Sequence, residues 1–255
     1  MKKKENLTDI EVTQKSYYNN IAELYDKHYA SPYALEYRHW VYDMVFNNME
    51  LKGKLALDAM CGGGEATTYL LKRGAKVVGL DISEECCKIY QQKFPQNKVI
   101  CASILNTDFK DNYFDIIITD SLHHLHPNVE KGLIEIHRIL KPDGYFCCWE
   151  PNYKSLFDLL RRLWYKTDPK FFEQNEQSID ISLFKRKFNN KFEIIKTVYG
   201  GNIAYLLVNS SMIFRIPLNI VKYYYKPLIF IEKILTNIQP AIFSLFVLCL
   251  LKKID

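Results

Sequence analysis

Three consecutive glycines interrupt the segment LDAMCGGGEAT, which begins at Leu57, between an apolar run and a helix-like run. Glycine lets a strand turn sharply into a helix, because it adopts positive φ without the steric penalty of a Cβ atom. It also leaves no side chain in the way of a ligand, and the N–H groups of a helix N-terminus favour an anionic group. The pattern therefore predicts a site for a ligand bearing a phosphate or carboxylate over residues 61–64.

Asp81 closes the next apolar segment, KVVGLD, at a distance of about 20 residues from Asp58. An acid in this place after a glycine-rich turn accepts hydrogen bonds from both hydroxyls of a ribose. A plain cap of the following helix is the alternative role. Thr67 stands where the dinucleotide fingerprint G-x-G-x-x-G needs its third small residue, so an NAD-binding oxidoreductase is only the remoter hypothesis.

Two adjacent histidines, His123 and His124, follow the apolar segment 114–120. With an unperturbed pKa of about 6.5, either one could accept a proton at neutral pH. Packing, or a hydrogen bond to the backbone, is the alternative. Residues 123, 124 and 126 have no carboxylate at the spacing of a zinc or iron site, so no metal is predicted.

Five short β-rich runs alternate with helical patterns between residues 54 and 150. Their near-continuous apolarity predicts strands that are covered on both faces, and the alternation predicts parallel strands joined by crossover helices. Such open sheets bind ligands at the carboxyl ends of their strands. The predicted strands are 54–60, 76–81, 97–102, 114–120 and 144–150.

Further elements are predicted on both sides of this region. Ser31-Pro32 opens a helical pattern, and residues 16–29 predict a short helix whose tyrosines serve mainly in packing. Residues 155–166 predict a basic amphipathic helix. Residues 191–201 and 243–253 predict two more strands.

The composition of the 255-residue chain predicts one large domain, or one domain with an appendage. Its seven cysteines show no C-x-x-C pair, which indicates reduced thiols of a cytosolic protein. The start of the sequence lacks the apolar stretch of a secretory signal, so export is not expected. The longest apolar run in the tail has 11 residues, whereas a bilayer-spanning helix needs about 20.

Four segments resemble, in order and spacing, the motifs of class I S-adenosylmethionine-dependent methyltransferases, particularly the small-molecule group with a type-11 methyltransferase domain. They are LDAMCGGGEAT, GLDIS, DNYFDIIITDSLHHL and EIHRILKPDGYF. The resemblance implies an α/β fold: a Rossmann-like, doubly wound, seven-stranded, mostly parallel sheet with an antiparallel last strand. It also implies an N-terminal helical cover (1–50), a cofactor-binding core (51–152) and a C-terminal part of the same domain with cap helices and the last two strands (153–255).

The same resemblance implies S-adenosylmethionine as the cofactor. The candidate contacts are Tyr25, Asp58, Met60, Cys61, Gly62, Gly64, Asp81, Ile82, Ser103, Ile104, Asp120 and Ser121. Three positions depart from the family pattern. Met60 replaces a glycine, Ser103 stands where an adenine-contacting aspartate is common, and Asp143 replaces the second glycine of LKPGG. Together these departures leave open a reduced affinity for the cofactor or, as the remoter alternative, a fold that has lost activity.

Methyl transfer in such a family needs an acceptor held in line, and a base where the acceptor is a hydroxyl. His124 or His123 is the expected base. The expected acceptor is a hydroxyl of a glycan, lipid or natural-product intermediate, with N- or C-methylation of a small molecule, or tRNA or rRNA methylation, as alternatives. No RNA-binding module is recognisable, so nucleic acid is not favoured as a partner.

The tail is basic, with 16 Lys and Arg against 8 Asp and Glu from residue 151 onward. Tyrosines, lysines and aliphatic residues interleave over residues 215–235. This composition suits a lid over an apolar acceptor, a peripheral contact with a membrane, or packing that includes a homodimer. A cytoplasmic location is expected, at the membrane surface if the second alternative holds.

Overall fold

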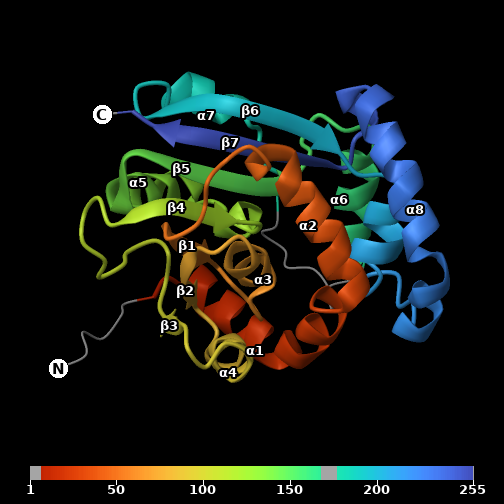
Figure 1. Ribbon diagram of the computed structural model, residues 1–255, viewed down its shortest axis with the longest axis horizontal. Helices are drawn as coiled ribbons and strands as arrows, with labels where there is room; N and C mark the ends of the chain where they lie inside the picture. The colour runs from red at the N-terminus through yellow and green to blue at the C-terminus, as the bar shows by residue number, and fades with distance from the viewer. Residues whose placement is uncertain (1–6, 168–176, 255) are drawn as a thin grey trace.

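One seven-stranded sheet crosses the part of the chain that the computed structural model describes, residues 7–167 and 177–254. Helices pack against both faces of this sheet (Figure 1). The strands are β1 (Leu55–Ala59), β2 (Lys76–Asp81), β3 (Lys98–Cys101), β4 (Phe114–Thr119), β5 (Leu140–Pro151), β6 (Phe192–Gly200) and β7 (Phe246–Lys253). All seven predicted strands and the Rossmann-like α/β class are therefore confirmed.

The strand order is β3-β2-β1-β4-β5-β7-β6. Strands β1 to β5 pair in parallel, and β7 lies antiparallel between β5 and β6, as expected. The chain moves outward from β1 to β3 and then returns to β4, on the other side of β1. In an open parallel sheet this reversal leaves a crevice at the carboxyl ends of the strands.

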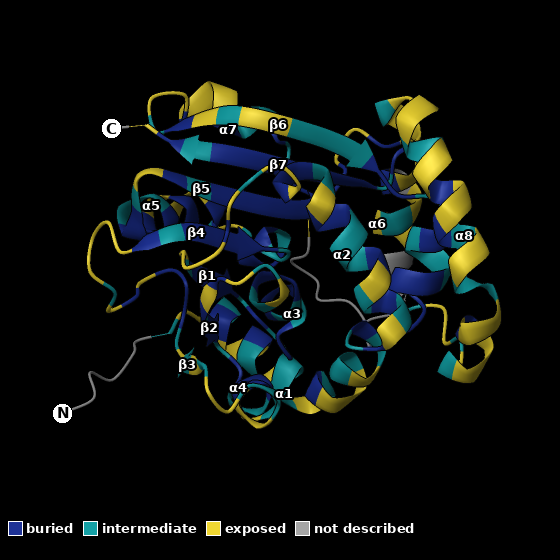
Figure 2. Cartoon of the chain, viewed as in Figure 1, coloured by how far each residue is buried: buried dark blue, intermediate teal, exposed yellow. Residues whose placement is uncertain are grey.

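The central strands send apolar side chains to both faces of the sheet. Leu57 and Ile117 lie in one core, whereas Ala56 and Ile116 lie in the other, as the two-residue period of a strand requires. Figure 2 shows these strands buried along most of their length. Burial on both faces explains why the sequence runs are almost continuously apolar.

Helices divide between the two cores and the carboxyl edge of the sheet. The core that contains Ile116 is covered by α2, α3 and α8, and the core that contains Ile117 by α5 and α7. Helix α1 contacts α4 beside β2 and β3. Their bounds are α1 (Asp9–Tyr29), α2 (Pro32–Phe46), α3 (Glu65–Lys72), α4 (Glu84–Lys93), α5 (Val129–Ile139), α6 (Phe157–Thr167), α7 (Ser182–Lys187) and α8 (Leu218–Ile238), with short η1 (Leu122–Leu125), η2 (Tyr205–Asn209) and η3 (Ala241–Phe243).

Two boundaries differ from the sequence prediction. Helix α1 begins at Asp9 and is a full helix of 21 residues, because Thr8 and Glu11 form a reciprocal capping box at its start. Strand β5 begins at Leu140, ahead of the Pro142 at which the preceding helix was expected to stop. Leu140 pairs with Phe114 of β4, so the sheet ends helix α5 earlier than the proline would.

Glu232 is a buried acid, and the only acid, in helix α8. Its carboxylate accepts hydrogen bonds from the backbone N–H groups of Ala204 at 2.6 Å and Tyr205 at 3.0 Å, and from the Tyr37 hydroxyl. It therefore fastens the start of η2 to α8 and α2. Burial raises the pKa of this carboxyl group.

We predict that Glu232→Ala lowers the free energy of unfolding by about 3 kcal/mol, because it leaves two backbone donors and a hydroxyl buried without an acceptor. Glu232→Gln keeps an acceptor oxygen and should lose about half as much. Denaturant unfolding measures both, with the exposed neighbour substitution Lys233→Ala as the control. A Glu232→Ala protein as stable as this control would contradict the assigned role.

Candidate functional site

A cavity with a volume of about 200 Å³ lies at the carboxyl ends of β1, β2 and β4, with α1 along one side. Its wall contains every residue predicted for cofactor binding or catalysis except Gly64. These residues are Tyr25, Asp58, Met60, Cys61, Gly62, Asp81, Ile82, Ser103, Ile104, Asp120, Ser121, His123 and His124. The predicted site residues therefore lie in the crevice that the strand order produces.

The glycine bend after β1 is shaped by three close approaches. The Gly62 N–H donates to Asp81 Oδ2 at 2.9 Å, with φ of +51° at Gly62. A Cβ on Gly63 would lie 2.1 Å from Asp26 Oδ1 of α1. A Cβ on Gly64, where φ is +89°, would lie 2.3 Å from Phe94, so Gly64 packs behind the cavity wall. Each glycine thus admits a different neighbour.

Asp81 is buried, and both of its oxygens are held by backbone donors. Oδ2 accepts from Gly62 and Oδ1 accepts from the Ser83 N–H at 2.9 Å. Burial raises the pKa of Asp81, and these two donors oppose that shift. Each carboxylate oxygen has a second lone pair. The group can therefore still accept hydrogen bonds from a ligand in the cavity.

Asp58 has a different environment at the end of β1. Its Oδ2 accepts from the Thr67 N–H at 2.9 Å and from the Thr67 hydroxyl at 2.7 Å. Burial raises the pKa of Asp58 well above its usual range. Asp58 therefore fastens the first turn of α3 to β1 while it lines the cavity.

Met60, two residues on, has φ of +60°, a left-handed conformation that explains why glycine is common at this place in the family.

Helix α2 supplies a cation that sequence reasoning missed. Arg38 Nη1 lies 2.5 Å from Asp120 Oδ2, and the Tyr42 hydroxyl donates to the same carboxylate at 2.7 Å. The guanidinium also lies over the Trp149 ring, 5.0 Å from its centroid. No local pattern in the sequence marks Arg38, because its partner stands 82 positions later.

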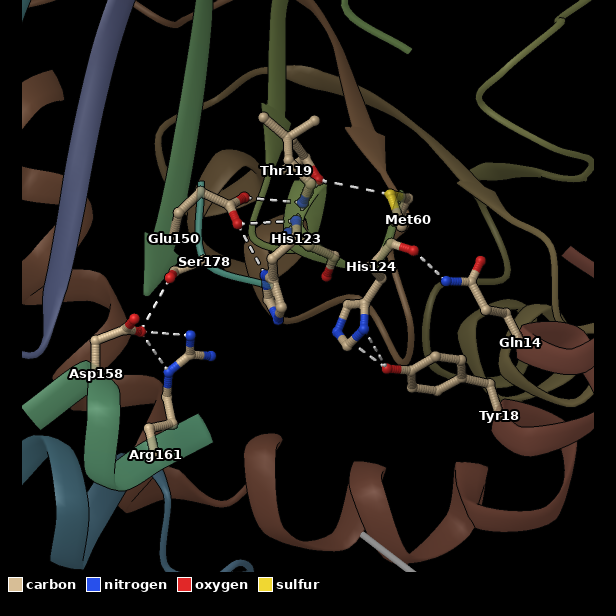
Figure 3. Close-up of polar contacts among 12 residues, drawn as sticks. Gln14, Tyr18, Met60, Thr119, His123, His124, Glu150, Asp158, Arg161 and Ser178 are labelled. Carbon is tan, nitrogen blue, oxygen red and sulfur yellow. Dashed lines mark hydrogen bonds and ion pairs between the residues drawn. The ribbon is translucent and has the colours of Figure 1, made fainter. Parts of the chain in front are cut away.

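Helix α1 closes the other side of the cavity with contacts that also lacked a sequence signal. Glu11 accepts a hydrogen bond from the Ser103 hydroxyl, and Gln14 donates to the backbone oxygen of His124. The Tyr18 hydroxyl lies 3.0 Å from His124 Nε2 (Figure 3). The α1 tyrosines were expected mainly in packing. Tyr18 and Tyr25 do stack edge to face, and both also line the cavity.

His123 and Glu150 form a buried pair across the ends of β4 and β5. His123 Nδ1 lies 2.8 Å from Glu150 Oε2, and the carboxylate also accepts from the backbone N–H groups of Leu122 and His123. Burial raises the pKa of Glu150 to about 8 and lowers the pKa of His123 well below its ordinary value. The Nε2 edge of the His123 ring points into the open space between Arg161 and His124 (Figure 3).

A second cavity of about 230 Å³ continues from the first. The two share Pro151, Tyr205, Ser210 and Ile213 in their walls. The wall of the second is mostly apolar and comes from α6, η2 and the segment before α8. Its apolar members are Pro151, Phe157, Leu160, Leu206, Ile213, Phe214 and Leu245.

One polar corner interrupts this apolar wall. Asp158 Oδ1 accepts from Arg161 Nη2 at 2.6 Å and from the Ser178 hydroxyl at 2.9 Å (Figure 3). Within residues 7–167 and 177–254, no group of three His, Cys, Asp or Glu side chains has the geometry of a metal site. The site is therefore an acid-lined cleft joined to an apolar chamber.

Comparisons with known proteins agree with this arrangement. The family model described as "Methyltransferase domain" matches residues 57–148. A demethylmenaquinone methyltransferase of Geobacillus stearothermophilus is 32% identical over 157 residues, which cover 58% of this chain and 66% of that protein. An uncharacterized methyltransferase of Synechocystis is 38% identical over 96 residues, which cover 37% of this chain and 45% of that protein. The matches thus span about half to two thirds of these relatives.

Solved structures show the same fold. The magnesium protoporphyrin IX methyltransferase of Synechocystis, solved with bound S-adenosylhomocysteine, superposes with a TM-score of 0.65 at 16% identity and covers 96% of this chain and 100% of that one. A methyltransferase from Archaeoglobus fulgidus gives a TM-score of 0.61 at 17% identity, over 91% and 98% of the two chains. With residues of three of its four motifs in the wall of one cleft, the chain carries, over residues 57–148, the methyltransferase domain of class I S-adenosylmethionine-dependent enzymes.

Proposed function

We propose that the chain transfers a methyl group from S-adenosylmethionine to a hydroxyl of a small, largely apolar acceptor. The observation that carries the proposal is the distribution of charge along the first cavity. Asp81 follows β2 and the Arg38–Asp120 pair lies beyond β4, with β1 between these two strands. A nucleoside with an amino-acid tail needs hydrogen-bond acceptors for its sugar, and opposite charges for its ammonium and carboxylate groups.

The residues present fit this cofactor in a further respect. Arg38 Nε is buried and has no hydrogen-bond partner among the described residues. A buried donor without a partner is costly, so a carboxylate at this place would satisfy it. Asp120 would then face the ammonium group, and Asp81 the ribose. When bound, the cofactor supplies an electrophilic methyl group on a positively charged sulfur, and the protein needs no covalent intermediate.

His123 is the better candidate for the base, whereas the sequence favoured neither histidine decisively. The His124 ring meets the Tyr18 hydroxyl, and its backbone oxygen accepts from Gln14, so α1 holds it as part of the cavity wall. His123 Nδ1 is oriented by Glu150, so Nε2 is the ring nitrogen that remains for a substrate in the first cavity. A carboxylate that holds one ring nitrogen sets the tautomer in which the other accepts a proton.

The second cavity supports an acceptor with an apolar body. Its aliphatic and aromatic wall would bury such a body, while the reactive hydroxyl reaches back to His123. The relative named as a demethylmenaquinone methyltransferase supports a quinone-like acceptor. The same base would also serve methylation at a carbon beside a hydroxyl.

Affinities for two cofactor analogues test the roles of Asp81 and Arg38 separately. We expect Asp81→Asn to weaken both S-adenosylhomocysteine and 5′-methylthioadenosine by about 100-fold, because both carry the ribose. Arg38→Gln should weaken S-adenosylhomocysteine by a similar factor and leave 5′-methylthioadenosine unchanged, since the latter lacks the amino-acid tail. Calorimetric titration measures all four affinities, with Asp108→Asn on the surface as the control.

Thermal unfolding with ligands tests the cofactor class itself. S-adenosylmethionine and S-adenosylhomocysteine should each raise the midpoint of unfolding, because they bind the folded state alone. NAD should not raise it. A shift with NAD and none with the two sulfur nucleosides would replace the methyltransferase proposal by the oxidoreductase one.

Acceptor length tests the second cavity. With 4-alkylphenols, kcat/KM should rise about threefold to fourfold for each added methylene until the cavity is filled, as expected for about 0.8 kcal/mol per buried CH₂. Ile213→Asp should remove this dependence, because it puts a charge into the shared wall. Release of S-adenosylhomocysteine reports turnover. A flat series would contradict the apolar acceptor.

The pH dependence tests the histidine pair. A base needs the deprotonated form of the pair, so turnover should rise with pH and level off above about 8, the pKa of Glu150. Glu150→Gln should lower the plateau and move the rise to lower pH, since the buried His123 then titrates alone, with its lowered pKa. His123→Gln should cut turnover by about 100-fold, with cofactor affinity unchanged.

His124→Gln is the matched control for this series. It should keep the plateau and move the rise to higher pH, because a charged His124 lowers the pKa of both Glu150 and His123. Undiminished turnover in His123→Gln would dismiss the base role, whatever the control shows.

A further inference from the structure

Helix α8 presents apolar side chains to solvent along its outer side. Tyr223, Phe230, Ile234 and Ile238 are 77, 64, 50 and 72% exposed, and they recur at intervals of four to seven residues along one side of the helix. Figure 2 shows exposed residues on successive turns of this helix. A surface helix of a water-soluble domain normally turns polar residues outward. The outer side of α8 therefore fits an environment other than bulk water.

The charges around this stripe are of one sign. Lys222, Lys226 and Lys233 are exposed and flank it along one side, and the helix has a single acid, Glu232, which is fully buried against Tyr37. Over residues 151–163 the pattern repeats. There Lys154 and Arg162 are exposed, and the one acid, Asp158, is buried. Exposed apolar groups are thus accompanied by exposed cations and by buried acids.

The N-terminal turn of α6 and η3 extend the stripe towards the second cavity. The Leu156 N–H donates to the Ile242 carbonyl oxygen at 2.9 Å, which joins the start of α6 to η3, and η3 follows α8 after two residues. Exposed apolar side chains gather at this junction: Leu156, Phe157, Leu160, Leu163, Ile242 and Phe243. Phe157 and Leu160 also line the second cavity, so its rim belongs to the same surface.

We propose that these side chains of α8, α6 and η3 form a docking surface for an anionic lipid bilayer, with the rim of the second cavity facing the lipid. Lysine stems can lie along apolar groups while their ammonium heads reach anionic headgroups. A helix with an apolar stripe and a flank of lysines lies in the plane of the interface. In the described ranges no helix is long and apolar enough to cross a bilayer, which agrees with attachment at the surface.

Charge decides between a membrane and a second copy of the chain as the occupant. A second copy would bring the same cations to the contact, whereas anionic headgroups bring the opposite charge. The entry of lipid-soluble acceptors through the rim is a further step, and this step rests on the proposed function. The docking itself does not, because it follows from α8, α6 and η3 alone.

Vesicle sedimentation with the full chain tests the docking surface. We expect binding to phosphatidylcholine vesicles that contain about 30% phosphatidylglycerol, and much weaker binding to phosphatidylcholine alone. Phe230→Ser combined with Ile234→Ser should reduce the affinity for the anionic vesicles at least about tenfold. Lys222→Gln, Lys226→Gln and Lys233→Gln together should abolish the preference for anionic lipid.

The matched control combines Ile134→Ser on α5 with Ile195→Ser on β6, two exposed apolar residues outside the docking surface. It should bind vesicles like the parent chain. Equal binding by the Phe230/Ile234 variant and the parent would overturn the proposal, and so would a dimer in sedimentation velocity that this variant dissociates. Calorimetry with S-adenosylhomocysteine on the same preparations keeps the two proposals apart. A parent chain that binds S-adenosylhomocysteine but not the anionic vesicles would reject the docking surface alone.

Discussion

Buried carboxylates at the ends of neighbouring strands organise this site. Asp58, Asp81 and Glu150 lie almost fully out of water at the carboxyl ends of β1, β2 and β5. Taking an ionised carboxylate out of water is expensive unless hydrogen-bond donors surround it. The chain meets this demand with main-chain N–H groups from the glycine bend, from the start of α3 and from η1. The positions of those donors therefore fix the carboxylates that line the cavity.

Asp120 is the exception, because its partners are side chains from α2 and not local amides. Arg38 and Tyr42 reach it from the side of the core that contains Ile116, and Trp149 supports the guanidinium from β5. This pair couples the N-terminal helices to the strand ends. Under the proposed function, recognition of the amino-acid end of the cofactor depends on how α2 packs, whereas recognition of its sugar depends on β2 and its turn.

The sequence predicted local features well and long-range ones poorly. The strands, the glycine bend and Asp81 follow from periodicity and turn chemistry, which depend on near neighbours. Arg38, Glu11 and Tyr18 reach the site from helices whose partners are distant in the chain, and no local pattern reports such contacts. Gly64 illustrates the opposite limit. The motif predicts a cofactor contact there, whereas the ring of Phe94 packs where a Cβ of Gly64 would lie.

The place of β7 has a consequence for the order in which the molecule is assembled. In the described sheet β6 pairs with β7 alone, and β7 pairs with β5 across about a hundred intervening residues. Such distant pairings form late when a chain folds. Until residues 246–253 leave the ribosome, β6 has no partner in the described sheet, whereas β1 to β5 already have theirs. The strand ends that carry Asp58, Asp81 and Asp120 can thus assemble on a growing chain before the outer pair of strands joins the sheet.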